Sequence, residues 1–136
     1  MALHLIKLCV GAATPDELAA WRAERAKLGH RPIVHTRQTP KRADEILDGG
    51  SLYWVFKGVI LIRQRVKVIE TVGEGSAKRC EILLDDAMIA TAPQPRRALQ
   101  GWRYLTPKDA PADLSDTAAG DVPLELAQRL REVGAW

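Results

Sequence analysis

Cysteine is scarce in this sequence. Its two cysteines, Cys9 and Cys80, lie far apart and outside any C-x-x-C pair, so neither a disulfide framework nor a cysteine-rich zinc site is indicated. No apolar run approaches the roughly 20 residues that a membrane-spanning helix needs. The apolar start of the chain holds Lys7 and has no basic stretch before it, unlike a secretory signal. We therefore expect a cytoplasmic protein that does not associate with a membrane.

The motifs of several enzyme classes are also missing. The sequence has no H-E-x-x-H, no G-x-S-x-G and no glycine-rich phosphate loop, and its three histidines do not have metal-ligand spacing. Asp85 and Asp86 are adjacent, so on a strand they would point to opposite faces and could not act together as acid and base. We expect no metal and no cofactor. Whether the protein is an enzyme stays open.

Length and composition fit one globular domain. The chain has 136 residues, of which 46% are hydrophobic and 27% charged, as in ordinary compact domains. We expect residues 1–114 to form a single barrel-like domain. Residues 115–136 are predicted to be an acidic linker and an amphipathic helix, which could hold a homodimer together through Leu126 and Leu130.

The first strand and helix are strongly marked. Residues 3–10 are rich in Leu, Ile and Val without helical spacing, which favours a central strand. Thr14 as a cap, Pro15 in the first turn and Gly29 as a stop predict a helix between them. Trp21 falls on the apolar side of this helix and is expected to pack on the sheet.

Strands dominate the middle of the chain. Residues 32–36 predict a second strand, and residues 39–49 predict a short helix with Thr39 as its cap. Residues 51–72 carry the strongest strand pattern, with Gly58 at the turn between two antiparallel strands. Residues 80–86 predict a further strand.

Prolines then limit regular structure. Four of them lie within residues 92–114, at positions 93, 95, 107 and 111, so at most a short edge strand is expected there, over residues 100–105. The order of elements predicts an α+β fold. We expect a small, curved, mostly antiparallel sheet or barrel with two or three flanking helices.

Three long segments resemble a known family. They are LHLIKLCVGA, PKRADEILDGGSLYWVFKGVILIRQR and PQPRRALQGWRYLTPKDAPADL, and they closely resemble the bacterial domain of unknown function DUF1489, seen mainly in alphaproteobacteria. The resemblance extends to about Leu114 and implies no activity. More loosely, the layout is similar to the pseudouridine-synthase-and-archaeosine-transglycosylase-like (PUA-like) barrels of ASCH and EVE type, some of which hold a flipped modified base.

Basic residues concentrate in the middle of the chain. Residues 22–108 hold 17 Lys and Arg against 9 Asp and Glu, whereas the two flanks hold 3 against 8. This distribution is typical of a chain whose central part faces an anion. A solvated surface of mixed charge is the alternative.

One candidate site lies at the junction of the second strand and second helix. His35, Arg37, Lys41 and Arg42 come together there in the sequence. Amide groups at a helix amino terminus, with cationic side chains nearby, suit a phosphate. Alternatively, Lys41 and Arg42 are solvated residues of a first helical turn, where cations are slightly unfavourable.

A second candidate site combines aromatic and basic residues. Trp102 and Tyr104 stand among arginines, a composition that can stack bases while the cations hold the backbone. Gln100 could read a base edge through its amide. The residues of this site are Arg96, Arg97, Gln100, Trp102, Arg103 and Tyr104. Alternatively, Trp102 covers the open end of the core.

A third candidate is a basic stripe. Ile60, Ile62, Val66 and Val68 should share one face of a strand, and Arg63, Arg65 and Lys67 the other, close to Lys57. Cations in line can follow a polyanion, but they can equally form the solvated face of an antiparallel sheet.

These observations favour a domain that binds RNA or a nucleotide. The His35–Arg42 junction and the segment from Arg96 to Tyr104 would be two sides of one cleft. A rival hypothesis is a metal-independent ribonuclease with His35 as acid or base and Arg37 or Lys41 stabilising the phosphate. A third is a protein adaptor that meets its partner through the carboxy-terminal helix and exposed aromatics.

Overall fold

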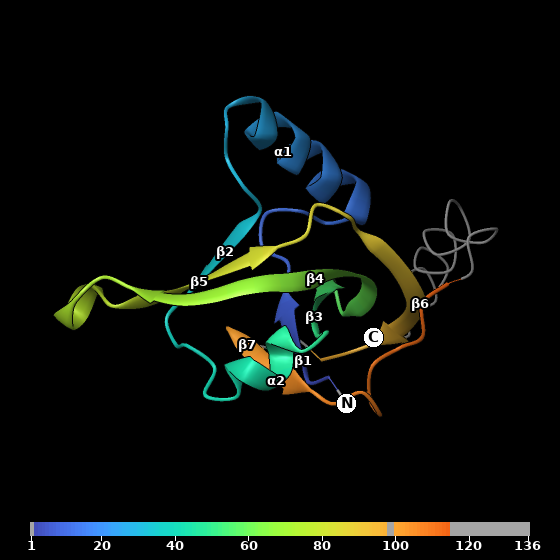
Figure 1. The fold of residues 1–136 in the computed structure, drawn as a ribbon. Helices are drawn as coiled ribbons and strands as arrows, with labels where there is room; N and C mark the ends of the chain where they lie inside the picture. Colours follow the sequence, from blue (N-terminus) through green and yellow to red (C-terminus); the bar gives the residue numbers. More distant parts are fainter. Residues whose placement is uncertain (1, 98–99, 115–136) are drawn as a thin grey trace.

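The computed structural model describes residues 2–97 and 100–114 of the chain. In this part, seven strands form one curved sheet with two helices at its margins (Figure 1). The strands are β1 (His4–Leu8), β2 (Ile33–Thr36), β3 (Ser51–Phe56), β4 (Val59–Val72), β5 (Arg79–Leu84), β6 (Ile89–Pro95) and β7 (Trp102–Leu105). The helices are α1 (Pro15–Lys27) and α2 (Ala43–Leu47), with a short 3₁₀ turn, η1 (Gly75–Ala77). The predicted α+β fold is confirmed.

The sheet is open and mostly antiparallel. Its strand order is β2–β5–β4–β3–β1–β7, and β6 pairs with β4 beside this path. Only β1 and β3 run parallel among the described pairs. The path ends at β2 and β7, which do not pair with each other within the described residues, so the expected curvature is present without closure into a barrel.

Strand β3 is the centre of the core. All six of its residues are buried. Its side chains alternate between a large apolar cluster, which holds Trp54 and Phe56, and a smaller one on the opposite face, which holds Tyr53 and Val55. Burying a large apolar side chain contributes about 1.5–3 kcal/mol. Two covered faces explain why this segment reads as a nearly continuous apolar run.

Two bulges bend the long strand β4. Leu61 has no counterpart in β3, and Lys67 has none in β5. Each extra residue moves the side chains after it to the other face of the sheet. Ile60 therefore packs in the smaller cluster, Ile62 packs in the larger one, and Val68 is exposed. The prediction of one shared apolar face over Ile60, Ile62, Val66 and Val68 is wrong.

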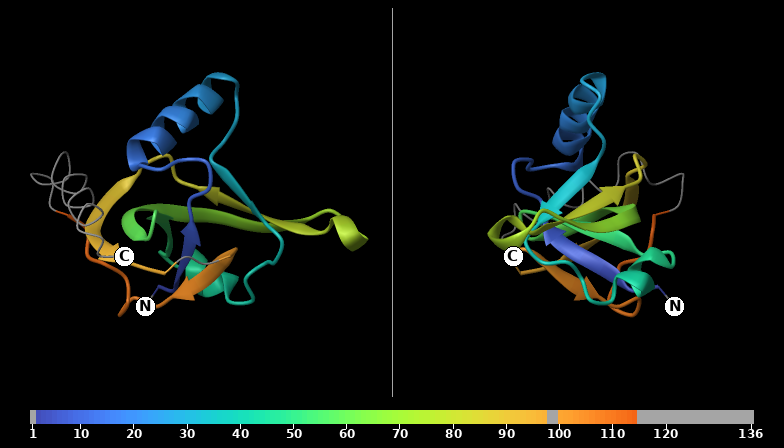
Figure 2. Two further views of the ribbon diagram at one scale, coloured as in Figure 1. Left: turned by 180° about the vertical axis from the view of Figure 1, so that it is seen from behind. Right: turned by 60° about the vertical axis from the view of Figure 1, so that its left-hand side comes forward.

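Helix α1 has the predicted ends but not the predicted packing. The Thr14 hydroxyl accepts a hydrogen bond from the backbone N–H of Glu17 at 3.2 Å, and Gly29 adopts a positive φ of 83° after the helix. Leu18 is buried, but Trp21 is 50% exposed, so the expectation that Trp21 lies in the core is wrong. The reason is visible in Figures 1 and 2: the helix meets the sheet near its amino end and rises away from it.

Helix α2 begins later than the sequence predicts. Its N-cap is Arg42, and no side chain caps it. The predicted cap, Thr39, instead shares a hydrogen bond of 2.7 Å with the hydroxyl of Thr71 on β4. Residues 37–42 therefore form a connecting segment that lies on the sheet rather than a first helical turn.

Strand β6 was not expected. It contains Pro93 and Pro95, whose presence argued against a strand there. It pairs with β4 on one edge and only through an isolated bridge, Thr91 with Asp113, on the other. Prolines are tolerated at such a margin because few ladder hydrogen bonds are required of them. The edge strand predicted within residues 100–105 is confirmed as β7.

An ion pair fixes residues 112–114 to the sheet. Arg63 donates to both carboxylate oxygens of Asp113, at 2.8 and 2.7 Å, and to the hydroxyl of Ser51 at 2.7 Å.

His4 lies close to this ion pair. Its Nδ1 accepts a hydrogen bond from the backbone N–H of Ser51 at 3.0 Å, and its ring packs edge-on against the Tyr53 ring. Burial, and then the nearby charge of Arg63, lower the pKa of His4.

No helix in residues 2–97 and 100–114 is long and apolar enough to cross a membrane. The predicted acidic linker and amphipathic helix over residues 115–136, with Leu126 and Leu130, lie outside the described residues.

We predict that Gly50→Ala strongly destabilises the fold. A Cβ atom at Gly50 would collide with the backbone carbonyl oxygens of Leu3 and Ile46, neither of which is a flexible side-chain end. We expect a loss of about 3 kcal/mol in the free energy of unfolding, measured by urea denaturation. The control is Gly75→Ala, whose φ of 56° is unfavourable but whose surroundings are open, so that it costs about 1 kcal/mol. Equal losses would contradict the prediction.

We also predict that His4 makes the fold less stable as the pH falls below about 6.5, its ordinary pKa. The folded state lowers the pKa of His4, so it binds fewer protons than the unfolded state, and stability declines as the pH drops through that range. Asn at position 4 keeps an acceptor for the Ser51 N–H but does not titrate. Urea denaturation at pH 7.5 and 5.5 should therefore show a smaller loss for His4→Asn than for wild type. A loss of the same size in both proteins would refute this role of His4.

Candidate functional site: a basic groove at β7

Strand β7 places two aromatic rings on one face of the sheet edge. Trp102 and Tyr104 are two residues apart, so they point to the same side. Their ring centroids are 5.0 Å apart in an edge-to-face arrangement, and both side chains are half-buried against the large core cluster. Trp102 is thus partly buried and partly exposed. The sequence offers two alternatives, a ring that stacks on bases and a ring that covers the core, and the observed burial of Trp102 is intermediate between them.

The connecting segment 37–42 docks onto these rings. The indole N–H of Trp102 donates to the backbone carbonyl of Gln38 at 3.0 Å. The hydroxyl of Tyr104 accepts the backbone N–H of Arg42 at 3.2 Å. Two segments more than sixty residues apart in the sequence are therefore held side by side.

Two adjoining hollows, which we call the basic groove, lie around Trp102. Their volumes are 630 and 580 Å³. Both are lined by Arg37, Gln38 and Trp102, so the two hollows are neighbours. The remaining lining residues are Lys7, His35, Thr36, Thr39, Lys41, Thr71, Lys78, Gln100, Gly101, Arg103 and Tyr104.

A third hollow, the Arg96 hollow, lies next to the groove. It has a volume of 1060 Å³ and is lined by Arg96, Arg97 and the apolar side chains Ile6 and Leu8, among others. It shares Gln100, Arg103 and Tyr104 with the basic groove. The two basic segments of the sequence thus line neighbouring hollows at the β7 edge of the sheet.

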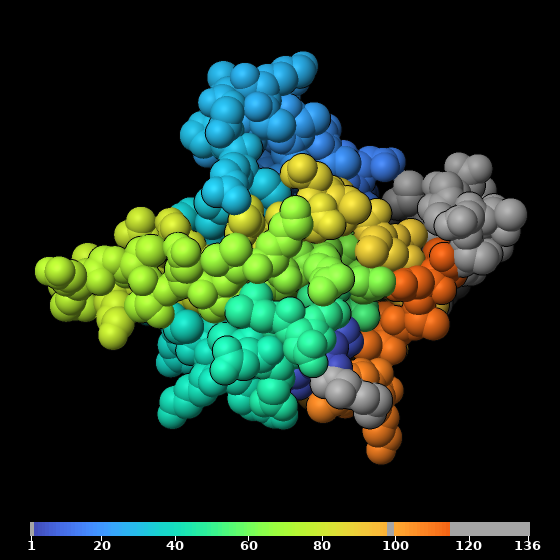
Figure 3. All heavy atoms as spheres, in the orientation of Figure 1, coloured from blue at the N-terminus to red at the C-terminus, as the bar shows by residue number. Residues whose placement is uncertain are grey.

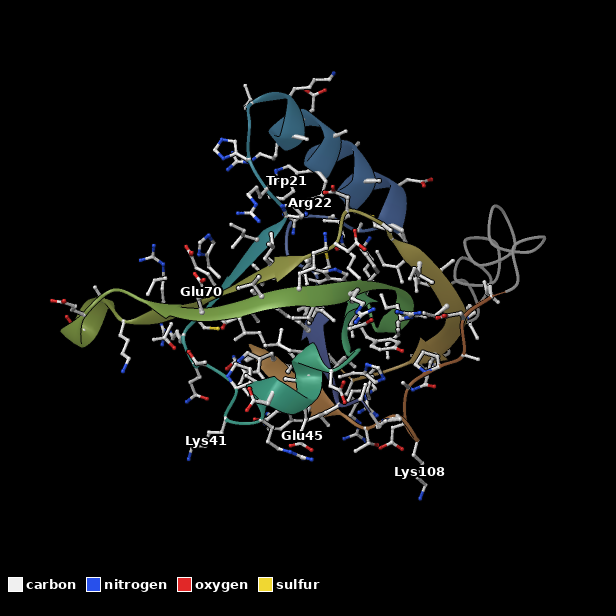
Figure 4. The ribbon with its side chains drawn as sticks, viewed as in Figure 1. Trp21, Arg22, Lys41, Glu45, Glu70 and Lys108 are labelled. Atoms are coloured by element: carbon white, nitrogen blue, oxygen red, sulfur yellow. The ribbon has the colours of Figure 1, made fainter. Side chains whose placement is uncertain are left out.

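This surface is strongly cationic. No Asp or Glu is among the described residues that line the three hollows, whereas seven cationic residues are: Lys7, Arg37, Lys41, Lys78, Arg96, Arg97 and Arg103. Lys41 extends from the connecting segment into solvent (Figure 4). Hollows lined by charge of one sign focus the field and attract ions of the opposite sign.

Three predicted site residues do not line the three hollows. Arg42 forms a bidentate pair with Glu45, one of whose hydrogen bonds measures 2.8 Å. Lys57 is in the β3–β4 turn with a positive φ of 46°, and Arg63 is held by Asp113. The expected phosphate site at the start of the second helix is also absent, because α2 has five residues and two acids, Asp44 and Glu45, in its first turn.

Two cations of the groove were not predicted as site residues from the sequence. Lys7 interrupts an apolar strand, and its position in β1 is paired with Trp102 in β7. Lys78 follows η1 in the hairpin of β4 and β5, which projects beyond the body of the molecule (Figure 3). The cation inside an apolar run was a usable signal for Lys7. The position of Lys78 depends on the bend of β4, and nothing in the sequence around Lys78 indicates that it lines the groove.

His35 faces both the groove and an acid. It lines one of the hollows, and its Nδ1 is 3.5 Å from a carboxylate oxygen of Glu81, the residue opposite it on β5. Its side chain is 55% exposed. A carboxylate at one ring nitrogen orients an imidazole and leaves the other nitrogen available for proton transfer.

The described residues contain no group of three or more His, Cys, Asp or Glu side chains that could hold a metal ion. The side chains that line the groove offer ionic, aromatic and hydrogen-bonding contacts, and His35 adds an imidazole.

Comparison with curated proteins and with solved structures found no match. A family model does match, over residues 5–136, and its description is "Protein of unknown function (DUF1489)". This match includes every residue of the basic groove and the Arg96 hollow. The chain belongs to the DUF1489 family.

Proposed function

We propose that the protein binds RNA, or a nucleotide as the smallest such ligand, in the basic groove and the Arg96 hollow. The observation that carries the proposal is the composition of this surface: seven cations and two aromatic rings line neighbouring hollows, and no acidic residue lines them among the described residues. Neutralisation of phosphates by Lys and Arg supplies most of the affinity in such interfaces.

The parts of the groove suit different parts of a nucleotide. Arg37, Lys41 and Lys78 line the hollow beside Tyr104 and would meet phosphates. The N–H of Trp102 is already bonded to Gln38, so its ring is what remains for contact with a base. The amide of Gln100, which is exposed and lines two of the hollows, can both donate to and accept from a base edge.

Unpaired RNA is the better fit to this surface. The hollows of the groove have volumes of 580 and 630 Å³, within the range of about 300–1,000 Å³ that is typical of small-ligand pockets. A base reaches such a hollow only when it is not stacked in a helix, and sequence-specific RNA readers mostly take single-stranded segments.

The similarity of layout to PUA-like barrels is part of this proposal. Some of those barrels hold a flipped base, and we propose that this protein also holds an unstacked base. We likewise place the activity in the cytoplasm of a bacterial cell. The adaptor alternative depends on a carboxy-terminal helix that lies outside the described residues.

We predict that charge reversal in the groove abolishes most RNA binding. In an Arg37→Glu, Arg103→Glu double variant, affinity for a fluorescent single-stranded RNA should fall more than about tenfold at moderate salt. The slope of log affinity against log salt should become shallower by about two, one for each phosphate that no longer has an arginine beside it. Fluorescence anisotropy at several salt concentrations measures both quantities.

The matched control is Arg65→Glu with Lys67→Glu. These β4 residues are exposed, do not line the three hollows, and undergo the same change of charge. An equal loss of affinity in the control would mean that net charge, rather than the groove, holds the RNA. Polyphosphate, which has charge but no bases, is a further competitor. Displacement of the RNA by polyphosphate at equal phosphate concentration would remove the role given to Trp102 and Gln100.

A second candidate function is RNA cleavage. It is favoured by the position of His35, which lines the groove and has the Glu81 carboxylate 3.5 Å from its Nδ1. In this arrangement His35 would accept or donate a proton at the ribose phosphate, and a cation of the groove would stabilise the charge that develops.

For this second function we predict that purified wild-type protein shortens a labelled RNA without added metal and that His35→Ala stops this cleavage. RNA binding by His35→Ala should change little, since one imidazole ring is removed and the seven cations of the surface remain. Denaturing gels and anisotropy on the same samples measure the two properties. Intact RNA after incubation with wild type would eliminate the ribonuclease and leave the binding function in place.

A further inference from the structure

A second, smaller cavity lies beneath helix α1, away from the aromatic rings of the groove. We call it the α1 cavity. Its volume is 390 Å³, and Trp21 and Arg22 of α1 lie between the helix and the sheet (Figure 4). The lining residues come from β1 and the loop after it, from α1, and from β2 and β3.

The walls of the α1 cavity are mainly apolar. Leu18, Val34 and Trp54 are each at most 6% exposed. The indole N–H of Trp54 is bonded to Gln64 at 2.9 Å, so Trp54 gives the cavity no free donor. Cys9 also lines it, and burial raises the pKa of that thiol, which keeps it in the neutral, weakly polar form.

Arg22 introduces a partly buried cation into these mainly apolar walls. Its Nε is shielded from solvent and has no hydrogen-bond partner among the described residues. Burial lowers the pKa of the guanidinium, but an arginine keeps its charge in proteins. No Asp or Glu is among the described residues that line the cavity. A buried donor without an acceptor is rare and costly, and needs a physical explanation.

Trp21 fixes the position of this guanidinium. The Arg22 guanidinium carbon lies 5.0 Å from the centroid of the Trp21 rings, and the Arg25 guanidinium carbon lies 5.4 Å from it. Both distances allow cation–π attraction. The stacking holds Arg22 in place with its Nε still unsatisfied, and it explains why a large aromatic residue stays half exposed on this helix.

We propose that the α1 cavity binds a small carboxylate with an apolar body, of the class of a medium-chain fatty acid. The apolar body would occupy the space between Leu18, Val34 and Trp54, and the carboxylate would pair with the guanidinium of Arg22. A guanidinium presents its N–H groups in a fork that matches a carboxylate. Apart from Lys7 and Arg22 the cavity walls carry no charge, and a ligand with an apolar body suits them better than the doubly charged, strongly hydrated phosphate. This site differs from the RNA groove in its ligand and in its test.

Octanoate is the probe, and octanamide is its uncharged counterpart. Isothermal titration of the full chain should show that octanoate binds and that octanamide binds about tenfold more weakly or not at all, because the charged hydrogen bond is lost. Arg22→Met, which keeps length and apolar character, should weaken octanoate binding about tenfold. The control is Arg25→Met, which removes the other guanidinium beside Trp21 but not a cavity residue, and should leave the affinity within about twofold, as for a solvent-screened charge.

The reactivity of Cys9 provides a second measurement on the wild-type protein, so the test does not depend on the folding of a variant. Cys9 lines the cavity, whereas Cys80 is fully buried elsewhere in the core and serves as internal reference. Octanoate should slow alkylation of Cys9 several-fold and leave Cys80 unchanged, as read by mass spectrometry. Absence of octanoate binding, equal binding of octanamide, or an unchanged rate at Cys9 would each overturn the proposal.

Discussion

The docking of segment 37–42 onto β7 creates the candidate site. Neither part forms a groove alone: β7 is a four-residue edge strand, and the segment has no regular structure. The hydrogen bonds from Trp102 to the Gln38 carbonyl and from the Arg42 amide to Tyr104 join them. Both bonds use backbone groups of the segment, so they fix its path whatever its side chains are. The side chains Arg37 and Lys41 are consequently left to line the hollows.

The placement of charge follows from this geometry. Cations that line one hollow repel one another, and a fold tolerates this only where water screens them or where an anion is bound. Arginines that have an acid within reach are used for structure, as Arg42 with Glu45 and Arg63 with Asp113 show. The groove arginines have no such partners among the described residues. The proposed function rests on this gathering of arginines without acidic partners around the hollows rather than on net charge.

Patterns of neighbouring residues in the sequence predicted those helices and strands whose ends and burial are set by residues close by in the chain. Thr14 and Gly29 mark the ends of α1 through a side-chain cap and a positive φ, and the apolar run of β3 reports burial on both faces. The bulges at Leu61 and Lys67 could not be predicted, because an extra residue is visible only against the partner strand. The same limit applies to the site. The sequence predicted Arg37 and Trp102, but the groove position of Lys78 and the unsatisfied Nε of Arg22 depend on neighbours that only the fold brings near.

Lys7 connects the two candidate sites. Its position on β1 is paired with Trp54 of β3 on one side and with Trp102 of β7 on the other, and it lines both the α1 cavity and the basic groove. One ammonium group can neutralise only one anion fully. A carboxylate near Lys7 in the cavity and a phosphate near it in the groove therefore compete for the same charge, and any such coupling acts equally in both directions. A cation within an otherwise apolar strand costs desolvation wherever it lies, and its place between two anion-attracting hollows gives that cost a physical reason.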